Sequence, residues 1–155
     1  MANQINWGEI YCSSLWGDES NKESVPEFPI FCALIQADCG TQYTYSGNQN
    51  FPESYNFNLN ATGTSTLTYQ AYDIPDKWVI IQDGVVLLDT GYRGAASYQA
   101  ALDTELALRG MPPETIQGVG SGTANFSVGS TSPLYVYVYA PLTNTSFQTT
   151  ISCPI

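Results

Sequence analysis

The 155-residue sequence contains no histidine, and only 4 lysines and arginines stand against 14 aspartates and glutamates. Without histidine, the chain lacks the commonest general base and a frequent metal ligand. The net charge of -10 repels nucleic acid, so we expect no DNA- or RNA-binding role. No run approaches about 18 apolar residues, and the sequence therefore predicts no membrane-spanning segment.

The first residues, MANQINWGEIY, lack the charged and apolar regions of a signal peptide, which predicts synthesis in the cytosol without a leader. The chain has no Cys-x-x-Cys, so a zinc site would need all four thiolates at irregular spacing. The pattern favours free buried thiols, or disulfides that form only after release from the cell. The candidate cysteines are Cys12, Cys32, Cys39 and Cys153.

Charged residues make up 12% of the chain and aromatic residues 13%. Together with abundant Ser, Thr, Asn, Gln and Gly, this composition is typical of an all-β protein with a polar, uncharged surface, as on particle exteriors and adhesins. A simply soluble acidic domain fits it as well. The length predicts a single domain over residues 1–155. Residues 1–29 are predicted to be an N-terminal arm that docks onto partners.

A β-hairpin is predicted at mid-chain, with strands Trp78–Gln82 and Val85–Asp89 joined by Asp83-Gly84. Asp-Gly between two β-branched runs favours a type I′ turn, which needs positive φ at both positions. An unbroken register would place Trp78 opposite Asp89. One face would then carry Val79, Ile81, Val86 and Leu88. Because both faces are largely apolar, we expect the hairpin inside a layered fold and not on an open edge.

Other segments alternate at the strand period, most clearly Leu134–Ala140 (LYVYVYA). A helix is predicted around residues 97–109, with Leu102, Leu106 and Leu108 in its apolar stripe and Gly110 as its C′ residue. Many short strands and one helix predict a mainly β protein. The expected fold is an antiparallel β-sandwich, either Ig-like or jelly-roll-like.

Acidic side chains near the hairpin give the first candidate site. Asp73 and Asp76 precede its first strand and Asp89 closes its second, so pairing brings all three to one end, where they could bind Ca²⁺. The alternative is ordinary turn chemistry, in which these carboxylates accept hydrogen bonds from backbone N–H groups. The spacing favours the alternative, because no EF-hand pattern is present.

Aromatic residues give the second candidate, an interface. Tyr135, Tyr137 and Tyr139 share one face of a strand and suit protein contacts or stacking on sugars. They fit a second core face, or a face covered by the helix, equally well. In the arm, the candidate anchors are Trp7, Tyr11 and Trp16.

No motif marks a catalytic site. Asp89-Thr90-Gly91 resembles the aspartic-protease triplet, but that enzyme needs two carboxylates that share a proton. Gly118–Gly122 has neither the Gly-Lys-Ser/Thr of a phosphate loop nor the spacing of a nucleophile elbow. We therefore expect the protein not to be an enzyme.

Two groups of motifs carry a resemblance to known proteins. INWGEIYC and LWGDES, in the first twenty residues, resemble the start of small virion proteins of tailed bacteriophages, including those that infect cyanobacteria. YDIPDKWVIIQDGVVLLDTGYRG, GVGSGTANF and YAPLTNTSFQTTISCP resemble a β-sandwich module of phage structural proteins and some bacterial surface proteins. The resemblance covers the last half of the chain well and the first forty residues loosely. It departs at Phe147, where that module has Trp.

The resemblance implies a non-enzymatic structural protein on the exterior of a virion, made in the host cytoplasm. Decoration of the capsid is the favoured position, and a neck, baseplate or fibre component is the alternative. The implied partners are major capsid or tail proteins, in a homo-oligomer or a lattice. A module that binds cell-surface glycans, with no cofactor or with Ca²⁺, is the other hypothesis.

Overall fold

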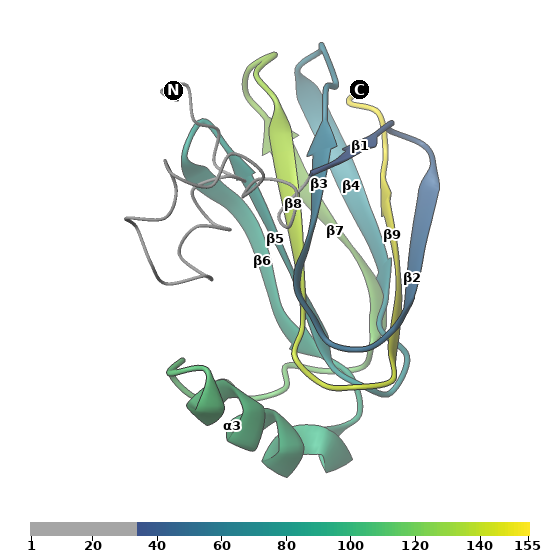
Figure 1. Cartoon of the computed structure of the whole chain (residues 1–155). Helices are drawn as coiled ribbons and strands as arrows, with labels where there is room; N and C mark the ends of the chain where they lie inside the picture. The colour runs from purple at the N-terminus through teal and green to yellow at the C-terminus, as the bar shows by residue number, and fades with distance from the viewer. Residues whose placement is uncertain (1–33) are drawn as a thin grey trace, which may run out of the picture.

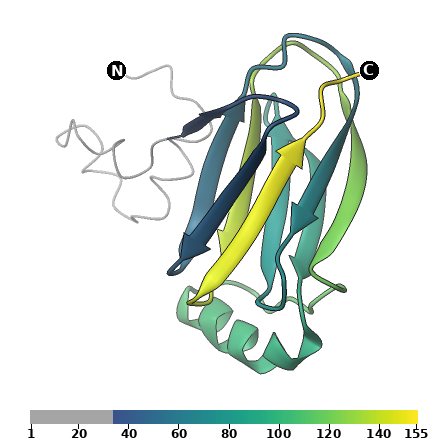
Figure 2. The same ribbon diagram turned by 90° about the vertical axis from the view of Figure 1, so that its right-hand side faces the viewer.

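The chain folds into two β-sheets that pack face to face, with a helix across one end (Figures 1 and 2). The computed structural model describes residues 34–155. The predictions for residues 1–29 and for Trp7, Tyr11, Cys12, Trp16 and Cys32 therefore lie outside the described residues.

The strand order is β1-β3-β8-β5-β6 in the first sheet and β2-β9-β4-β7 in the second. The first sheet contains β1 (Ile35–Ala37), β3 (Asn50–Phe57), β8 (Leu134–Ala140), β5 (Asp76–Gln82) and β6 (Val85–Arg93). The second contains β2 (Gln42–Gly47), β9 (Thr145–Ile151), β4 (Gly63–Gln70) and β7 (Ser121–Val128). The predicted antiparallel β-sandwich is confirmed, with one exception, because β1 pairs with β3 in parallel.

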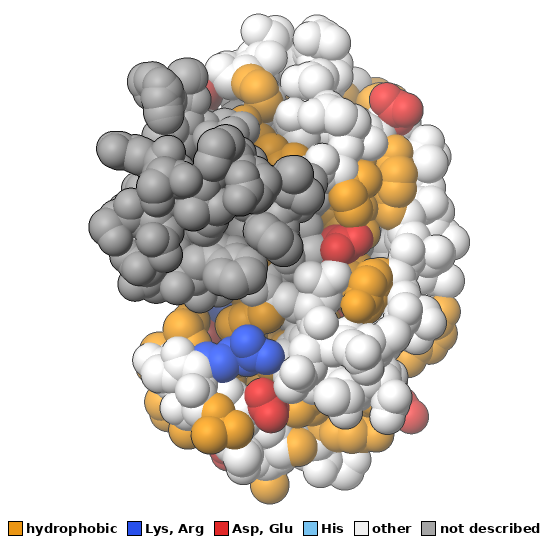
Figure 3. Space-filling model, viewed as in Figure 1, with side chains coloured by type: hydrophobic (Ala, Val, Ile, Leu, Met, Phe, Trp, Pro, Cys, Tyr) orange, Lys and Arg blue, Asp and Glu red, His pale blue; other side chains and the backbone are white. Residues whose placement is uncertain are grey.

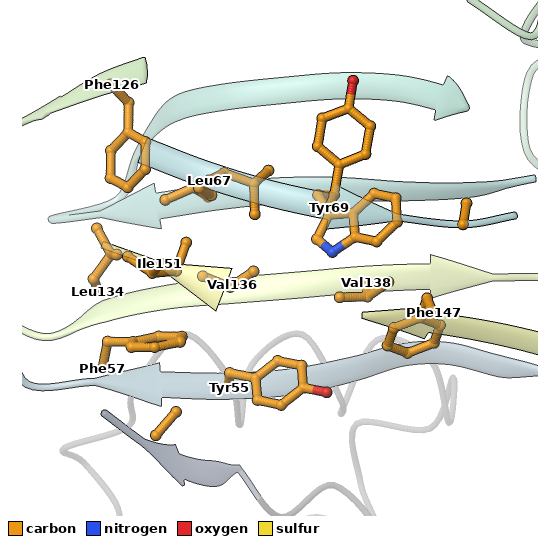
Figure 4. Packing of buried hydrophobic residues seen from close by; sticks show 14 of the residues in the cluster. Tyr55, Phe57, Leu67, Tyr69, Phe126, Leu134, Val136, Val138, Phe147 and Ile151 are labelled. Carbon is orange, nitrogen blue, oxygen red and sulfur yellow. The ribbon is translucent and has the colours of Figure 1, made fainter. Parts of the chain in front are cut away.

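The core lies between the sheets and is built by alternation along their strands. Leu134, Val136 and Val138 of β8 point into it, as the LYVYVYA pattern predicts. Trp78 is fully buried at its centre, and its indole Nε1–H donates to Thr149 Oγ1 on the facing sheet at 2.7 Å. Tyr69 and Phe147 pack around this ring, with centroids 5.1 and 6.1 Å away. Several of these side chains are shown in Figure 4.

The predicted hairpin turn is confirmed, but its register is not. Asp83 and Gly84 have φ of 53° and 75°, as a type I′ turn requires. Between Ile81 and Ile80 the register shifts by one residue. As a result, Val79 lies opposite Asp89, where Trp78 was expected. A second shift follows towards the far end of β6, where Gly91 has φ of 66°. An extra residue in one strand makes a β-bulge, which increases local twist.

These bulges lie in β6, which ends the strand order of its sheet within the described residues. Val85 and Val86 are 58% and 55% exposed. The expectation that both strands lie inside the fold is therefore correct for β5 and wrong for β6. Of the two hairpin strands, β5 has a strand on each side, β8 and β6, whereas β6 has one described neighbour, β5.

The predicted helix is α3 (Gln99–Leu108), preceded by the 3₁₀ turn η2 (Ala96–Tyr98). Leu102 and Leu106 are buried, whereas Leu108 is 75% exposed, contrary to the predicted stripe. Gly110 ends the helix with φ of 71°. Its N–H donates to Ala107 O, and the next N–H donates to Leu106 O, which is the Schellman arrangement.

A disulfide joins Cys39 and Cys153, 114 residues apart. The Gly40 N–H donates to Ile151 O beside it, and Ile155 exchanges two backbone hydrogen bonds with Thr64. The last residues are therefore fixed both to the turn between β1 and β2 and to β4.

Replacing Trp78 with Ala should lower the free energy of unfolding by about 3–5 kcal/mol, because it leaves a cavity between the sheets. The control Val85→Ala, at an exposed position, should change it by less than about 0.5 kcal/mol. Urea unfolding followed by circular dichroism measures both. Equal effects of the two substitutions would contradict the assigned core.

Replacing both Cys39 and Cys153 with Ser should lower the free energy of unfolding by about 2–5 kcal/mol, because the disulfide closes a long loop of the unfolded chain. The comparison is made by urea unfolding of the oxidised proteins. A variant as stable as the oxidised parent would show that this disulfide does not form in solution.

Candidate functional site

The three aspartates predicted to bind Ca²⁺ do not form one site. Asp76 points into the protein and is fully buried, where it accepts hydrogen bonds from the Thr145 hydroxyl at 2.8 and 3.1 Å. Asp89 turns back on its own strand and accepts from the Gly91 N–H at 2.9 Å. Asp73 is exposed. In residues 34–155, no three His, Cys, Asp or Glu side chains lie close enough together to hold a metal ion.

The hydrogen bonds of Asp89 match the alternative interpretation, turn chemistry. The adjacent Thr90 hydroxyl accepts from the Trp78 N–H at 3.0 Å and donates to Gly91 O at 2.7 Å. The Asp-Thr-Gly triplet thus satisfies backbone groups at the bulge in β6.

The tyrosines predicted to form an interface are buried within the chain. Tyr135, Tyr137 and Tyr139 belong to a second apolar cluster with Val79 and the helix, on the side of the first sheet that faces away from the main core. Tyr137 is only 1% exposed. Their position in the described structure fits the second-core alternative, and their role as an interface stays a prediction. The alternating sequence of the strand places these side chains on one face. It does not show whether other parts of the chain cover that face.

The outer face of the second sheet is open and carries no charge. None of its four strands contains Asp, Glu, Lys or Arg. The outward positions are occupied by Gln42, Thr44 and Ser46 in β2, Thr64, Thr66, Thr68 and Gln70 in β4, Ser121, Thr123, Asn125 and Ser127 in β7, and Ser146, Gln148 and Thr150 in β9. We call this surface the hydroxyl–amide face.

Strand pairing aligns these side chains in rows across the sheet. One row contains Gln42, Thr150, Thr68 and Thr123, and the next contains Thr44, Gln148, Gln70 and Ser121. Some neighbours bond to each other, since Thr66 Oγ1 donates to Asn125 Oδ1 at 2.7 Å. The face therefore presents closely spaced hydroxyl and amide groups. Because it carries no charged side chain, a ligand could bind there without the cost of removing an ion from water.

Within residues 34–155, charged groups are confined to the first sheet, the helix and the connecting loops. The three basic residues of the described chain lie there and are engaged. Lys77 pairs with Glu114 at 2.8 Å, Arg109 pairs with Glu105 at 3.8 Å, and Arg93 donates to Val119 O at 3.2 Å. On the surface shown in Figure 3, acidic and basic side chains are few and scattered.

Two hollows adjoin the hydroxyl–amide face. One, of about 440 Å³, lies at its helix end and is lined by Ala71, Tyr72, Asp73, Ile74, Tyr98, Asn144 and Ser146. The other, of about 300 Å³, lies on the face itself and is lined by Gln42, Thr68, Tyr69, Gln70, Ser121, Gly122, Thr123, Gln148 and Thr150. We call them the end hollow and the face hollow.

Sequence reasoning missed both hollows and Tyr72, an exposed residue that lines the end hollow. The alternating Thr, Ser and Gln of the second sheet were visible in the sequence and could have indicated its polar face. The exposure of Tyr72 could not be predicted in the same way, because Tyr72 lies between β4 and β5, where the alternation of a strand no longer applies.

A scan against protein-family models finds no match, and neither does a search of curated protein sequences. Among solved structures, the chain is similar to the pre-peptidase C-terminal domain of a collagenase from Bacillus anthracis. The identity is 14% and the TM-score 0.46, over 77% of this chain and 95% of that one. A likeness at this level supports no argument about function.

The described residues include no helix both long and apolar enough to cross a membrane.

Burial raises the pKa of Asp76 well above its usual range, and the hydrogen bond from Thr145 opposes only part of this shift. A carboxyl group with a raised folded-state pKa stabilises the fold fully only below its unfolded pKa. Its contribution is lost as pH rises from the unfolded pKa through the folded one. Asparagine carries no charge at any pH, so Asp76→Asn should match the parent in melting temperature at about pH 4. At about pH 8 its melting temperature should exceed that of the parent by a few degrees.

Calorimetry across this pH range measures the difference between the two proteins. Burial also raises the pKa of Glu53, but that residue is present in both and its effect cancels. Asp73→Asn removes one exposed negative charge and serves as the control for net charge. A difference between parent and Asp76→Asn that stays constant with pH would contradict this explanation.

Proposed function

We propose that this protein is a non-enzymatic structural component on the outside of a tailed-phage virion, and that it decorates the capsid. A position at the neck, baseplate or fibre is the alternative. The observation that supports the proposal is the two-sided distribution of charge, with a neutral hydroxyl–amide face on one sheet and the charged side chains elsewhere.

A protein that coats a particle must hold the shell on one side and meet solvent and other molecules on the other. Three of the aromatic residues of the first 29 positions, Trp7, Tyr11 and Trp16, would supply anchors for the first task, since aromatic side chains dominate many interfaces. The hydroxyl–amide face would then point outwards. Many copies on one lattice would bind with avidity even where each contact is weak.

Two further properties suit a particle exterior. The disulfide and the hydrogen-bonded C-terminal residues tie the end of the chain to the sandwich. These links would help the protein to stay folded outside the cell, where disulfides persist. The net charge of -10 would keep neighbouring particles apart through electrostatic repulsion.

The protein should co-sediment with particles assembled from the major capsid protein of its phage. Replacing Trp7 and Trp16 together with Ser should abolish co-sedimentation, because it removes the aromatic anchors. Tyr72→Ser removes an exposed aromatic residue beside the outward face and is the matched control, which should bind like the parent.

Parallel experiments with assembled tails decide between the two positions. Binding to tails and not to capsids would favour the alternative position, at the neck, baseplate or fibre. Failure to co-sediment with either assembly would contradict the proposed function.

A further inference from the structure

Tyr72 combines a strained backbone with an exposed ring. Its φ is 58°, a left-handed conformation that costs energy for a bulky residue. Its side chain is nevertheless 49% exposed. Asn144, which also lines the end hollow, has a left-handed φ as well, of 62°. Strain of this kind persists only where neighbouring groups enforce it.

The neighbouring groups hold Tyr72 at both its backbone and its ring. The Tyr72 N–H donates to Gln70 Oε1 at 2.7 Å, and Gln148 Nε2 donates to the Tyr72 hydroxyl at 3.0 Å. Gly120 lies so close that a Cβ there would be 2.1 Å from Tyr72 O, so this approach requires glycine. The ring is therefore fixed in place before any ligand arrives, which lowers the entropy cost of binding.

The groups around the ring identify the ligand class. A fixed, half-exposed aromatic ring suits stacking against the C–H face of a pyranose. The end hollow adds the Asn144 amide, the Ser146 hydroxyl and the Asp73 carboxylate, which can bond to sugar hydroxyls. No Lys or Arg lines the hollow, and its one charged residue is acidic. An anionic ligand is therefore disfavoured and a neutral one favoured.

The face hollow extends this surface beyond one sugar. Gln148 lines it and also bonds to Tyr72, and Gln70 lies opposite Gln148 in the strand register. The side chains that line it are uncharged, and most end in hydroxyl or amide groups. Tyr72 lines the end hollow, of about 440 Å³, and Gln148 lines the face hollow, of about 300 Å³. Their sizes fall within the range of about 300–1,000 Å³ for small-molecule sites.

We propose that the end hollow and the face hollow together bind a neutral oligosaccharide, with one pyranose stacked on Tyr72 and the chain continuing across the hydroxyl–amide face. This site goes beyond the proposed attachment to the particle. It lies on the face that attachment would leave outwards.

The test uses the purified full-length chain on an array of neutral and acidic oligosaccharides. The neutral ligand with the strongest signal is then titrated in solution by calorimetry. We expect binding to neutral glycans and none to sialylated or uronate-containing ones. Binding to no glycan, or to acidic glycans only, would overturn the proposal.

Tyr72→Gly separates binding from folding, because glycine adopts a φ of 58° without steric cost. Its melting temperature should equal or exceed that of the parent, while affinity falls by about tenfold or more. Tyr72→Phe keeps the ring and should retain most of the affinity. Undiminished affinity in Tyr72→Gly would overturn the proposal.

A second pair of variants tests the face hollow. Thr68→Glu places a charge in it and should weaken binding of the same oligosaccharide. Val85→Glu adds the same charge at an exposed position of β6, in the other sheet and in the lining of neither hollow, and should not. Equal affinities of the two variants would overturn the extension across the face. Because particle binding is scored separately by co-sedimentation, failure of the glycan site leaves the proposed attachment standing, and the reverse also holds.

Discussion

The indole of Trp78 joins the two sheets at the centre of the sandwich. Its N–H is satisfied by Thr149 on the facing sheet, while Tyr69 and Phe147 of that sheet surround its rings. A buried donor without a partner would cost much of what the ring gains by burial. This contact therefore fixes the distance and the registration of the sheets. With the inner faces fixed, every other residue of β4 and β9 must point outwards, and the hydroxyl–amide face follows.

Local chemistry in the sequence was sufficient to predict the elements, but not every pairing. Asp83-Gly84 specifies its turn because few other residues adopt two positive φ values, and Gly110 marks the helix end for a similar reason. The bulges of β6 were not predictable, because a pattern of period two contains no signal for an extra residue. Gly91 is visible in hindsight as such a signal, since the left-handed φ at the second bulge favours glycine.

The site was harder to predict than the fold, because exposure depends on tertiary packing. The pattern around Tyr137 correctly groups three tyrosines on one face, but their burial depends on what else packs there. The position of Asp76 is similar, since alternation along β5 turns its carboxylate inwards to Thr145 and away from Asp89. Tyr72 was overlooked because its position depends on a strained turn and on contacts with residues 48 and 76 positions away.

The proposed function gives the protein two sides with separate tasks, one attached to a particle and the other presenting a neutral surface. An electron cryomicroscopy map of the particle, at a resolution that shows strands, tests this most directly. The sandwich should lie on the exterior, with the β2-β9-β4-β7 sheet facing away from the shell and Tyr72 accessible. A map in which this sheet is pressed against the shell, or in which the sandwich is absent from the particle, would contradict it.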